Sequence, residues 1–259
     1  MKNKGKIKIQ KMIQKVLKDF LKYEIALDEI EVVEPKKDEH GDYTTNIALR
    51  LAKILKKSPM DLASNLVENI KNKYALFEKV EFVHPGFINF FFKPQVLCEF
   101  LDFEEEEAKV NKKNLKDLFE ESSLKEMIQE HDLKDIESVQ YTHSRTYSII
   151  KIFKDEGIRI QDLQKENLNI EMNQLEKSLM KKMMKYPNII EKAVVSKKID
   201  GLVAYMFELN ELFYRFHEKI LFRKLDKPKL YVTLKIVEHV RNVMKNILEL
   251  FSIEAPEKM

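Results

Sequence analysis

Apolar residues recur at helical spacing near the start of the chain. Within residues 6–24 they occupy positions i, i+3 and i+4, which is typical of the buried face of an amphipathic helix. The residues of this stripe are Ile9, Met12, Ile13, Val16, Leu17, Phe20 and Leu21. The pattern predicts a first helix over residues 6–24.

Two further helices are indicated by residues that favour helix starts. Thr44 or Thr45 can cap one of them, because a hydroxyl accepts hydrogen bonds from the free amides of the first turn. Ser58 can cap the next, with Pro59 at the first helical position, where its missing amide hydrogen costs nothing. This last helix is expected to run to about Lys73.

Runs of β-forming residues alternate with these helices. The candidate strands cover residues 29–33, 80–83 and 87–92. Pro85 and Gly86 separate the last two runs and mark a tight turn, so we expect a hairpin there. This mixture of strands and helices predicts a small α+β domain over residues 1–95.

The second half of the chain has a different, helical pattern. Two long apolar stripes occur there: Leu202, Tyr205, Met206, Leu209, Leu212, Phe213 and Phe216 in one, and Ile236, Val240, Val243, Ile247 and Leu250 in the other. Helix breaks are expected at Gly157, at Tyr186-Pro187 and at Lys227-Pro228. The pattern predicts an all-α helix bundle over residues 138–259.

Charge is unevenly distributed along the chain. Residues 99–137 hold 14 acidic and 6 basic side chains, although the whole chain carries a net charge of +3. This composition predicts a helical or partly disordered connector over residues 96–137. The two flanking blocks are mildly basic and could contact the phosphate backbone of a nucleic acid, although ordinary solvated surfaces would show the same balance.

Several classes of protein are disfavoured by the composition. Cys98 is the single cysteine, and no cysteine or histidine cluster has the spacing of a metal site. The acidic neighbours of Cys98 would raise its pKa, which does not suit a nucleophile. The basic start of the chain is not followed by an apolar run, so we expect a cytoplasmic protein without a membrane segment.

Two short motifs in the first block resemble the N-terminal domain of arginyl-tRNA synthetases. Residues 40–48 read HGDYTTNIA and resemble the family's G-D-Y/F-x-T/S-N-x-A signature. Residues 84–90 read HPGFINF and resemble the G-x-G-F-I-N-F segment that closes the same domain. In the first motif a structural role is favoured, because Gly41 permits an unusual backbone conformation and Asp42 or Thr44 can cap the next helix.

The second motif is a candidate RNA contact. Phe87 and Asn89 alternate with Ile88 along the expected strand, so both project to the face opposite Ile88. A ring beside an amide suits stacking and hydrogen bonding to an unpaired base. The resemblance implies contact between the D-loop of the tRNA elbow and these two side chains together with His84. A core position for Phe87 and a turn position for Asn89 remain the alternative.

The helical block resembles the DALR-type anticodon-binding domain of the same family. Residues 139–145 read VQYTHSR and look like the V-Q-Y-x-H-A-R sequence that opens that domain. Tyr141 and Arg145 are four residues apart, so on a helix they share a face and could hold a base or a phosphate. His143 points elsewhere, and a structural role is expected for it.

The last residues extend the likeness. Residues 255–259 read APEKM and resemble the A/V-P-E-R/K-M ending of the family. The resemblance implies that Met259 and His217 lie against bases of the anticodon loop, although Met259 could instead cover the bundle core. Three lysines, Lys181, Lys182 and Lys185, could meet phosphates or simply face solvent.

The resemblance does not extend to catalysis. In the family a nucleotide-binding catalytic domain separates the two blocks, whereas here residues 93–137 provide 45 residues. The chain contains no H-I-G-H, K-M-S-K, P-loop or G-x-G-x-x-G string, so no ATP site and no cofactor are expected. We therefore predict a non-catalytic protein that binds tRNA, with arginine tRNA as the candidate.

Two other interpretations stay open. The chain could be the tRNA-recognition subunit of a split synthetase, with catalysis supplied by a separate polypeptide. It could also be a protein-interaction module whose acidic connector binds a synthetase or another translation factor. The oligomeric state cannot be predicted from the sequence.

Overall fold

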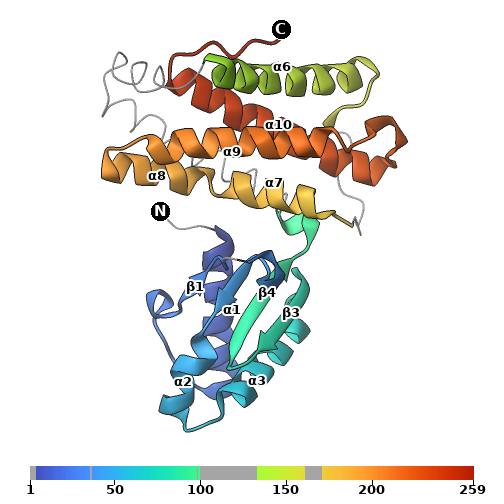
Figure 1. Cartoon of the computed structure of the whole chain (residues 1–259). Coiled ribbons are helices and arrows are strands. Elements are labelled where there is room, and N and C mark those ends of the chain that lie inside the picture. Colours follow the sequence, from blue (N-terminus) through green and yellow to red (C-terminus); the bar gives the residue numbers. More distant parts are fainter. Residues whose placement is uncertain (1–3, 36, 98, 100–132, 161–170) are drawn as a thin grey trace. The chain divides into compact units, whose positions relative to one another are not determined.

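The computed structural model describes the whole chain except residues 1–3, 36, 98, 100–132 and 161–170 (Figure 1). Most of the connector predicted over residues 96–137 lies outside the described residues, as does Cys98. The chain divides into two compact units, Met1–Val96 and Leu97–Met259.

The first unit contains a four-stranded antiparallel sheet in the order β1-β2-β4-β3. Its strands are β1 (Val32–Val33), β2 (Tyr43–Thr45), β3 (Phe77–Val83) and β4 (Phe87–Phe92). The β3–β4 hairpin is confirmed, and the amide of Gly86 donates to the carbonyl of Val83 at 2.8 Å in its turn. Strand β4 therefore lies between β2 and β3, with its residues flanked on both sides.

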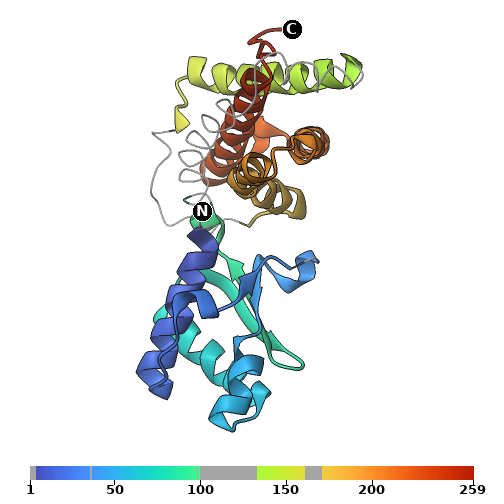
Figure 2. The same cartoon turned by 90° about the vertical axis from the view of Figure 1, so that its left-hand side faces the viewer.

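Three helices complete the first unit: α1 (Lys4–Leu21), α2 (Ile47–Leu55) and α3 (Pro59–Lys73). Figure 2 shows α1 and α3 on one face of the sheet. The apolar stripe of α1 is buried at Ile9, Ile13 and Leu17 and packs in a core that includes Phe90 and Phe92. Each fully buried side chain of this size contributes about 1.5–3 kcal/mol to folding, so this face holds the unit together.

The predicted capping of α3 is confirmed. The side chain of Ser58 accepts a hydrogen bond from the amide of Asp61 at 3.5 Å, and Pro59 begins the helix. At α2 the prediction is only partly right, because Asn46 is the capping residue. Thr45 instead lies in β2, where its hydroxyl accepts from the amide of Ile47 at 3.3 Å.

The predicted role of Asp42 as a helix cap is wrong. Its carboxylate accepts a hydrogen bond from the amide of Phe92 at 2.7 Å, and its own amide donates to the carbonyl of Phe90 at 2.8 Å. Asp42 therefore joins the start of β2 to the end of β4. Gly41 has a φ of +89°, and a Cβ at this position would lie 2.6 Å from the carbonyl oxygen of Phe90. The 40–48 motif thus has the structural role that the sequence favoured.

Two boundaries in the first unit differ from the prediction. The first helix ends at Leu21 because Lys22 has a φ of +50°, and Phe20 at its end is exposed. The strand predicted over residues 29–33 is reduced to two residues, and a 3-10 turn over Leu27–Glu29 precedes it. The length of β1 follows from its pairing with the short strand β2. The residues of β1 alone do not indicate that length.

The second unit is helical where it is described. Its long elements are α6 (Leu133–Asp155), α7 (Gln174–Met184), α8 (Tyr186–Ser196), α9 (Asp200–His217) and α10 (Lys227–Leu250). Helix α9 packs against the other four, and Figure 1 shows it running through the middle of the bundle. The two predicted stripes of α9 and α10 are buried almost throughout, apart from half-buried Leu212. The predicted fold class, an α+β domain followed by a helix bundle, is confirmed.

The predicted helix breaks are also confirmed. Gly157 follows the end of α6 with a φ of +82°, Tyr186 and Pro187 begin α8, and Lys227 and Pro228 begin α10. A further break, between α8 and α9, was not predicted. There Lys197 adopts a left-handed conformation with a φ of +54°. Lysine rarely adopts this conformation, so the sequence does not predict it.

Within the described part of the chain, the helices are too short or too polar to cross a lipid bilayer.

Candidate nucleic-acid interface

Two tyrosines stack on the surface where α6 meets α9. Tyr141 of α6 and Tyr214 of α9 have ring centroids 6.1 Å apart at an interplanar angle of 25°. They are 44% and 38% exposed, respectively, so each ring keeps one region accessible to solvent. Exposed aromatic faces of this kind accept nucleobases by stacking.

One turn further along α6, Arg145 contacts the end of α9. Its Nε donates a hydrogen bond to Nε2 of His217 at 3.0 Å. Because Nε2 accepts this bond, His217 must be neutral with its proton on Nδ1. Burial lowers the pKa of His217, and the positive charge of Arg145 lowers it further. The structure therefore brings together Tyr141, Arg145 and His217, three of the predicted anticodon-arm residues.

A groove of about 360 Å³ continues from Arg145. We name it the α6–α9 groove. Its walls come from α6 and from the segment that follows α9, and they are Arg145, Ile149, Ile152, Phe153, Ile220, Leu221, Phe222, Arg223 and Lys224. An apolar slot with cations at its edge suits a flat ring joined to a phosphate.

The final residues of the chain lie along α6. Nε2 of Gln140 donates to the carbonyl of Glu254 at 2.8 Å, and the amide of Met259 donates to Oγ of Ser144 at 3.1 Å. Between them, Nδ1 of His143 is 2.8 Å from the carbonyl oxygen of Pro256. His143 is buried, which lowers its pKa, and its structural role is confirmed.

Met259 lies at the surface of the unit. Its side chain is 61% exposed, so the alternative in which it covers the bundle core is wrong. Its amide is bonded to Ser144, which directly precedes Arg145 in α6. The exposed thioether is therefore held near the predicted anticodon-arm residues of α6.

The three predicted phosphate contacts differ in their surroundings. Lys182 forms an ion pair with Glu208, and its Nζ lies 4.9 Å from the ring centroid of Tyr205. Its charge is thus already partly compensated within the protein. Lys181 is half-buried and Lys185 is exposed, at the junction of α7 and α8. Contact between these lysines and phosphate stays a prediction.

In the first unit, the predicted elbow residues are not equally accessible. His84 is exposed in the hairpin turn, and Phe87 is 37% exposed at the start of β4. Asn89 is 1% exposed; β4 is an inner strand, and Asn89 lies between Thr44 of β2 and Glu81 of β3. Its Nδ2 has no hydrogen-bond partner among the described residues. The expected pairing of an exposed ring with an exposed amide is therefore not present in this structure.

Sequence reasoning missed Tyr214 and the groove-forming residues after α9. Tyr214 lies between two buried phenylalanines, Phe213 and Phe216, and is nevertheless exposed. Because Tyr214 is an aromatic residue outside the apolar stripe of α9, the sequence could have indicated that its ring is exposed. Phe222 lies beside His217, with ring centroids 6.4 Å apart, but only the packing of α6 against α9 assembles the groove.

Among the residues that the structure describes, no group of three or more His, Cys, Asp and Glu side chains could hold a metal ion.

Comparison with known families accounts for most of the chain. Residues 7–92 match the arginyl tRNA synthetase N terminal domain, and residues 139–259 match the DALR anticodon binding domain. These matches define a chain built from aminoacyl-tRNA synthetase domains. Specifically, it belongs to the arginyl-tRNA synthetase family, of which it carries the N-terminal and anticodon-binding domains.

Similar proteins are much longer than the regions they share with this chain. The arginine–tRNA ligase of Listeria welshimeri is 42% identical over 80 residues, which is 29% of this chain and 14% of the ligase. That of Acetivibrio thermocellus is 29% identical over 121 residues, 47% of this chain and 22% of the ligase. The solved arginyl-tRNA synthetase of Thermus thermophilus matches with 17% identity and a TM-score of 0.41, over 47% of this chain and 20% of that one.

Proposed function

We propose that this chain binds a tRNA at its elbow and anticodon arm without attaching an amino acid to it. The observation that carries the proposal is the α6–α9 groove with the stacked Tyr141 and Tyr214 beside it. An apolar slot, exposed rings and a cation next to one another are what an unpaired base and its phosphate require.

Arg145 is the residue on which the anticodon contact depends. Among the described residues, Arg145 donates one hydrogen bond, from its Nε to Nε2 of His217. Its two terminal nitrogens therefore remain available for a phosphate or a base edge, and His217 holds the guanidinium in a fixed orientation. Met259, exposed nearby, can pack on a neighbouring base.

At the elbow, Phe87 is the candidate stacking residue. It is exposed next to His84 in the hairpin turn, so a base of the D-loop can reach its ring. The amide of Asn89 lies below the surface and would join the contact only after a local shift of the neighbouring strands.

The absence of catalysis is part of the same proposal. The two matched ranges are separated by residues 93–138, and the sequence lacks the ATP-binding strings of this class. Activation of an amino acid requires groups arranged around the triphosphate and the developing charge, and our proposal assigns no such group to either matched domain. We further propose that the protein acts in the cytoplasm, as part of translation.

Filter binding with arginine tRNA tests this function. We expect binding that weakens when the anticodon bases are substituted, and weakens separately when the D-loop bases are substituted. Parallel charging assays with ATP and arginine should give no product from the chain alone. Charging that appears only when a second polypeptide is added would select the split-synthetase interpretation. A protein that retains no tRNA would favour the protein-interaction module.

A further inference from the structure

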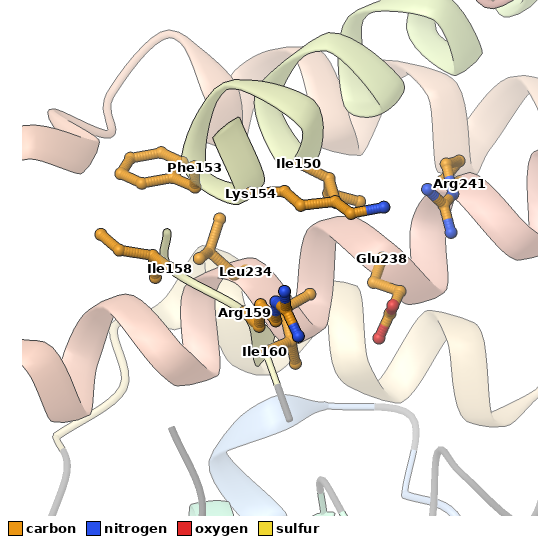
Figure 3. Close-up of a pocket in the computed structure, with 9 residues that line it drawn as sticks. All are labelled: Ile150, Phe153, Lys154, Ile158, Arg159, Ile160, Leu234, Glu238 and Arg241. Carbon is orange, nitrogen blue, oxygen red and sulfur yellow. The ribbon is translucent and has the colours of Figure 1, made fainter. Parts of the chain in front are cut away.

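A second hollow lies on another side of α6, between α6 and α10 (Figure 3). We name it the α6–α10 pocket. Its volume is about 490 Å³, within the range of roughly 300–1,000 Å³ typical of small-molecule sites. Arg145 and the two stacked tyrosines do not line it, so it is separate from the proposed anticodon contact, although Phe153 borders both hollows.

The polar lining of this pocket has an excess of positive charge. Lys154, Arg159 and Arg241 contribute three cations, against one carboxylate from Glu238. Figure 3 shows Lys154 extending from α6 toward Arg241 on α10. Within the part of the chain that the structure describes, none of the three cations forms an ion pair. Three cations against one carboxylate around one hollow favour an anionic ligand.

The charge of Glu238 is partly engaged elsewhere. Its Oε2 lies 3.8 Å from Nζ of Lys235 on the same helix, which is outside the lining. The carboxylate nevertheless keeps acceptor capacity, because each oxygen can accept more than one hydrogen bond. The ligand should therefore carry hydrogen-bond donors in addition to its negative charge.

The remaining lining is apolar. Phe153 and Leu234 are buried in the unit, and isoleucines from α6 and from the segment after it complete this surface. A surface of this kind accepts a flat, poorly hydrated ring. A free inorganic anion would leave it unused, and a fatty acid would offer no donor to Glu238.

From these three features we infer that the α6–α10 pocket binds a nucleoside monophosphate. The phosphate meets Arg159, Arg241 and Lys154, the base lies on the apolar surface, and Glu238 accepts from a ribose hydroxyl or an exocyclic amine. Two sources supply this chemistry, a free nucleotide and an unpaired nucleotide of a bound RNA. The free-nucleotide source does not depend on the proposed tRNA function.

Equilibrium dialysis of the full chain against AMP tests the inference, with adenosine and inorganic phosphate as comparison probes. AMP should be retained, and each comparison probe should bind about tenfold or more weakly, because it lacks half of the contacts. Arg159→Gln and Arg241→Gln should each weaken AMP binding about tenfold. Lys151→Gln, an exposed change on α6 outside the lining, should leave it unchanged.

The results that would overturn the inference are equally specific. They are no retention of AMP at millimolar concentration, unchanged AMP binding by both arginine variants with native circular dichroism, or phosphate binding as tight as AMP binding. Repeating the dialysis with saturating arginine tRNA separates the two sources. Displacement of AMP indicates that an RNA nucleotide uses the pocket, and undiminished AMP binding indicates a free nucleotide. A chain that binds AMP but no tRNA would refute the proposed function and leave this inference standing.

Discussion

At the contact between Arg145 and His217, the direction of one hydrogen bond determines how the candidate site responds to charge. The guanidinium donates and the imidazole accepts, so the contact exists only while His217 is neutral. Protonation of His217 would remove the acceptor and place two positive charges side by side. The pair therefore couples the orientation of Arg145 to the protonation of its neighbour.

The lowered pKa of His217 has a consequence for stability. Burial and Arg145 hold the pKa below its usual value of about 6.5, so the unfolded chain takes up a proton at a higher pH than the folded chain. We predict that the free energy of unfolding falls as the pH drops below about 6.5 toward the lower folded pKa. NMR titration of the imidazole and urea unfolding at several pH values measure the two quantities.

His143 shifts in the same direction, because it too is buried. The variant His217→Gln should therefore reduce the acid-side loss of stability without abolishing it. A His217 resonance that titrates above 6.5, or a variant with the same pH dependence as the parent, would contradict the assignment.

Arg145 can be tested by its effect on RNA binding. We predict that Arg145→Gln weakens tRNA binding by about 1–3 kcal/mol, because a charge-assisted contact is lost. If the partner is a phosphate, the slope of log K against log salt should fall by about one unit. Filter binding at several salt concentrations gives both numbers, with Lys151→Gln as the matched control on the same helix. An unchanged affinity and slope for Arg145→Gln would remove it from the interface.

Gly41 lies at a position of the first unit where both the backbone conformation and the available space favour glycine. Its φ of +89° is strained for any side chain, and a Cβ would approach the carbonyl oxygen of Phe90 to 2.6 Å. We predict that Gly41→Ala lowers the free energy of unfolding by about 1–3 kcal/mol, as measured by urea denaturation. Gly201→Ala in α9 is the control, because an added methyl meets nothing within 4 Å there and should not destabilise. Equal effects at both glycines would contradict this reading of the 40–48 motif.

At the scale of the element, sequence rules recovered what neighbouring residues determine. Ser58 and Pro59 correctly predict the start of α3, and Pro187 and Pro228 correctly predict the starts of α8 and α10. The rules failed where a distant strand decides. Asp42 looks like a helix cap, but β4 offers it the amide of Phe92, and Asn89 looks accessible until β2 and β3 flank it.

Helices α7 and α10 are joined by a buried ion pair. Glu176 is 0% exposed, and its Oε2 lies 2.5 Å from Nζ of Lys229. We predict that Lys229→Met lowers the free energy of unfolding by about 3 kcal/mol, because it leaves a buried carboxylate without its cation. Denaturation of this variant, measured beside the double variant Lys229→Met with Glu176→Gln, gives the test.

The double variant should recover most of the lost stability. Glutamine keeps the oxygen that accepts from the amide of Asn173 but carries no charge to leave uncompensated. A single variant as stable as the parent, or a double variant less stable than the single one, would contradict this account of the pair.

At the scale of the whole molecule, two domains that occur in arginine–tRNA ligases are present in one chain and separated by residues 93–138. Their identity could be read from short motifs, because those motifs include residues with fixed structural roles, such as Gly41 with its positive φ and buried His143 with its contact to Pro256. The groove beside Arg145 could not be read in the same way. Tyr141 and Tyr214 are in contact only because α6 packs against α9. The two residues are far apart in the sequence, so the contact cannot be predicted from it.

The central claim is that this chain binds a tRNA. The most direct measurement is a filter-binding titration of labelled arginine tRNA with the purified full chain, starting at low ionic strength. The account predicts saturable binding whose log K falls linearly with log salt, as counterions are released from the contacted phosphates. Failure to retain tRNA even at the lowest salt concentration would contradict it.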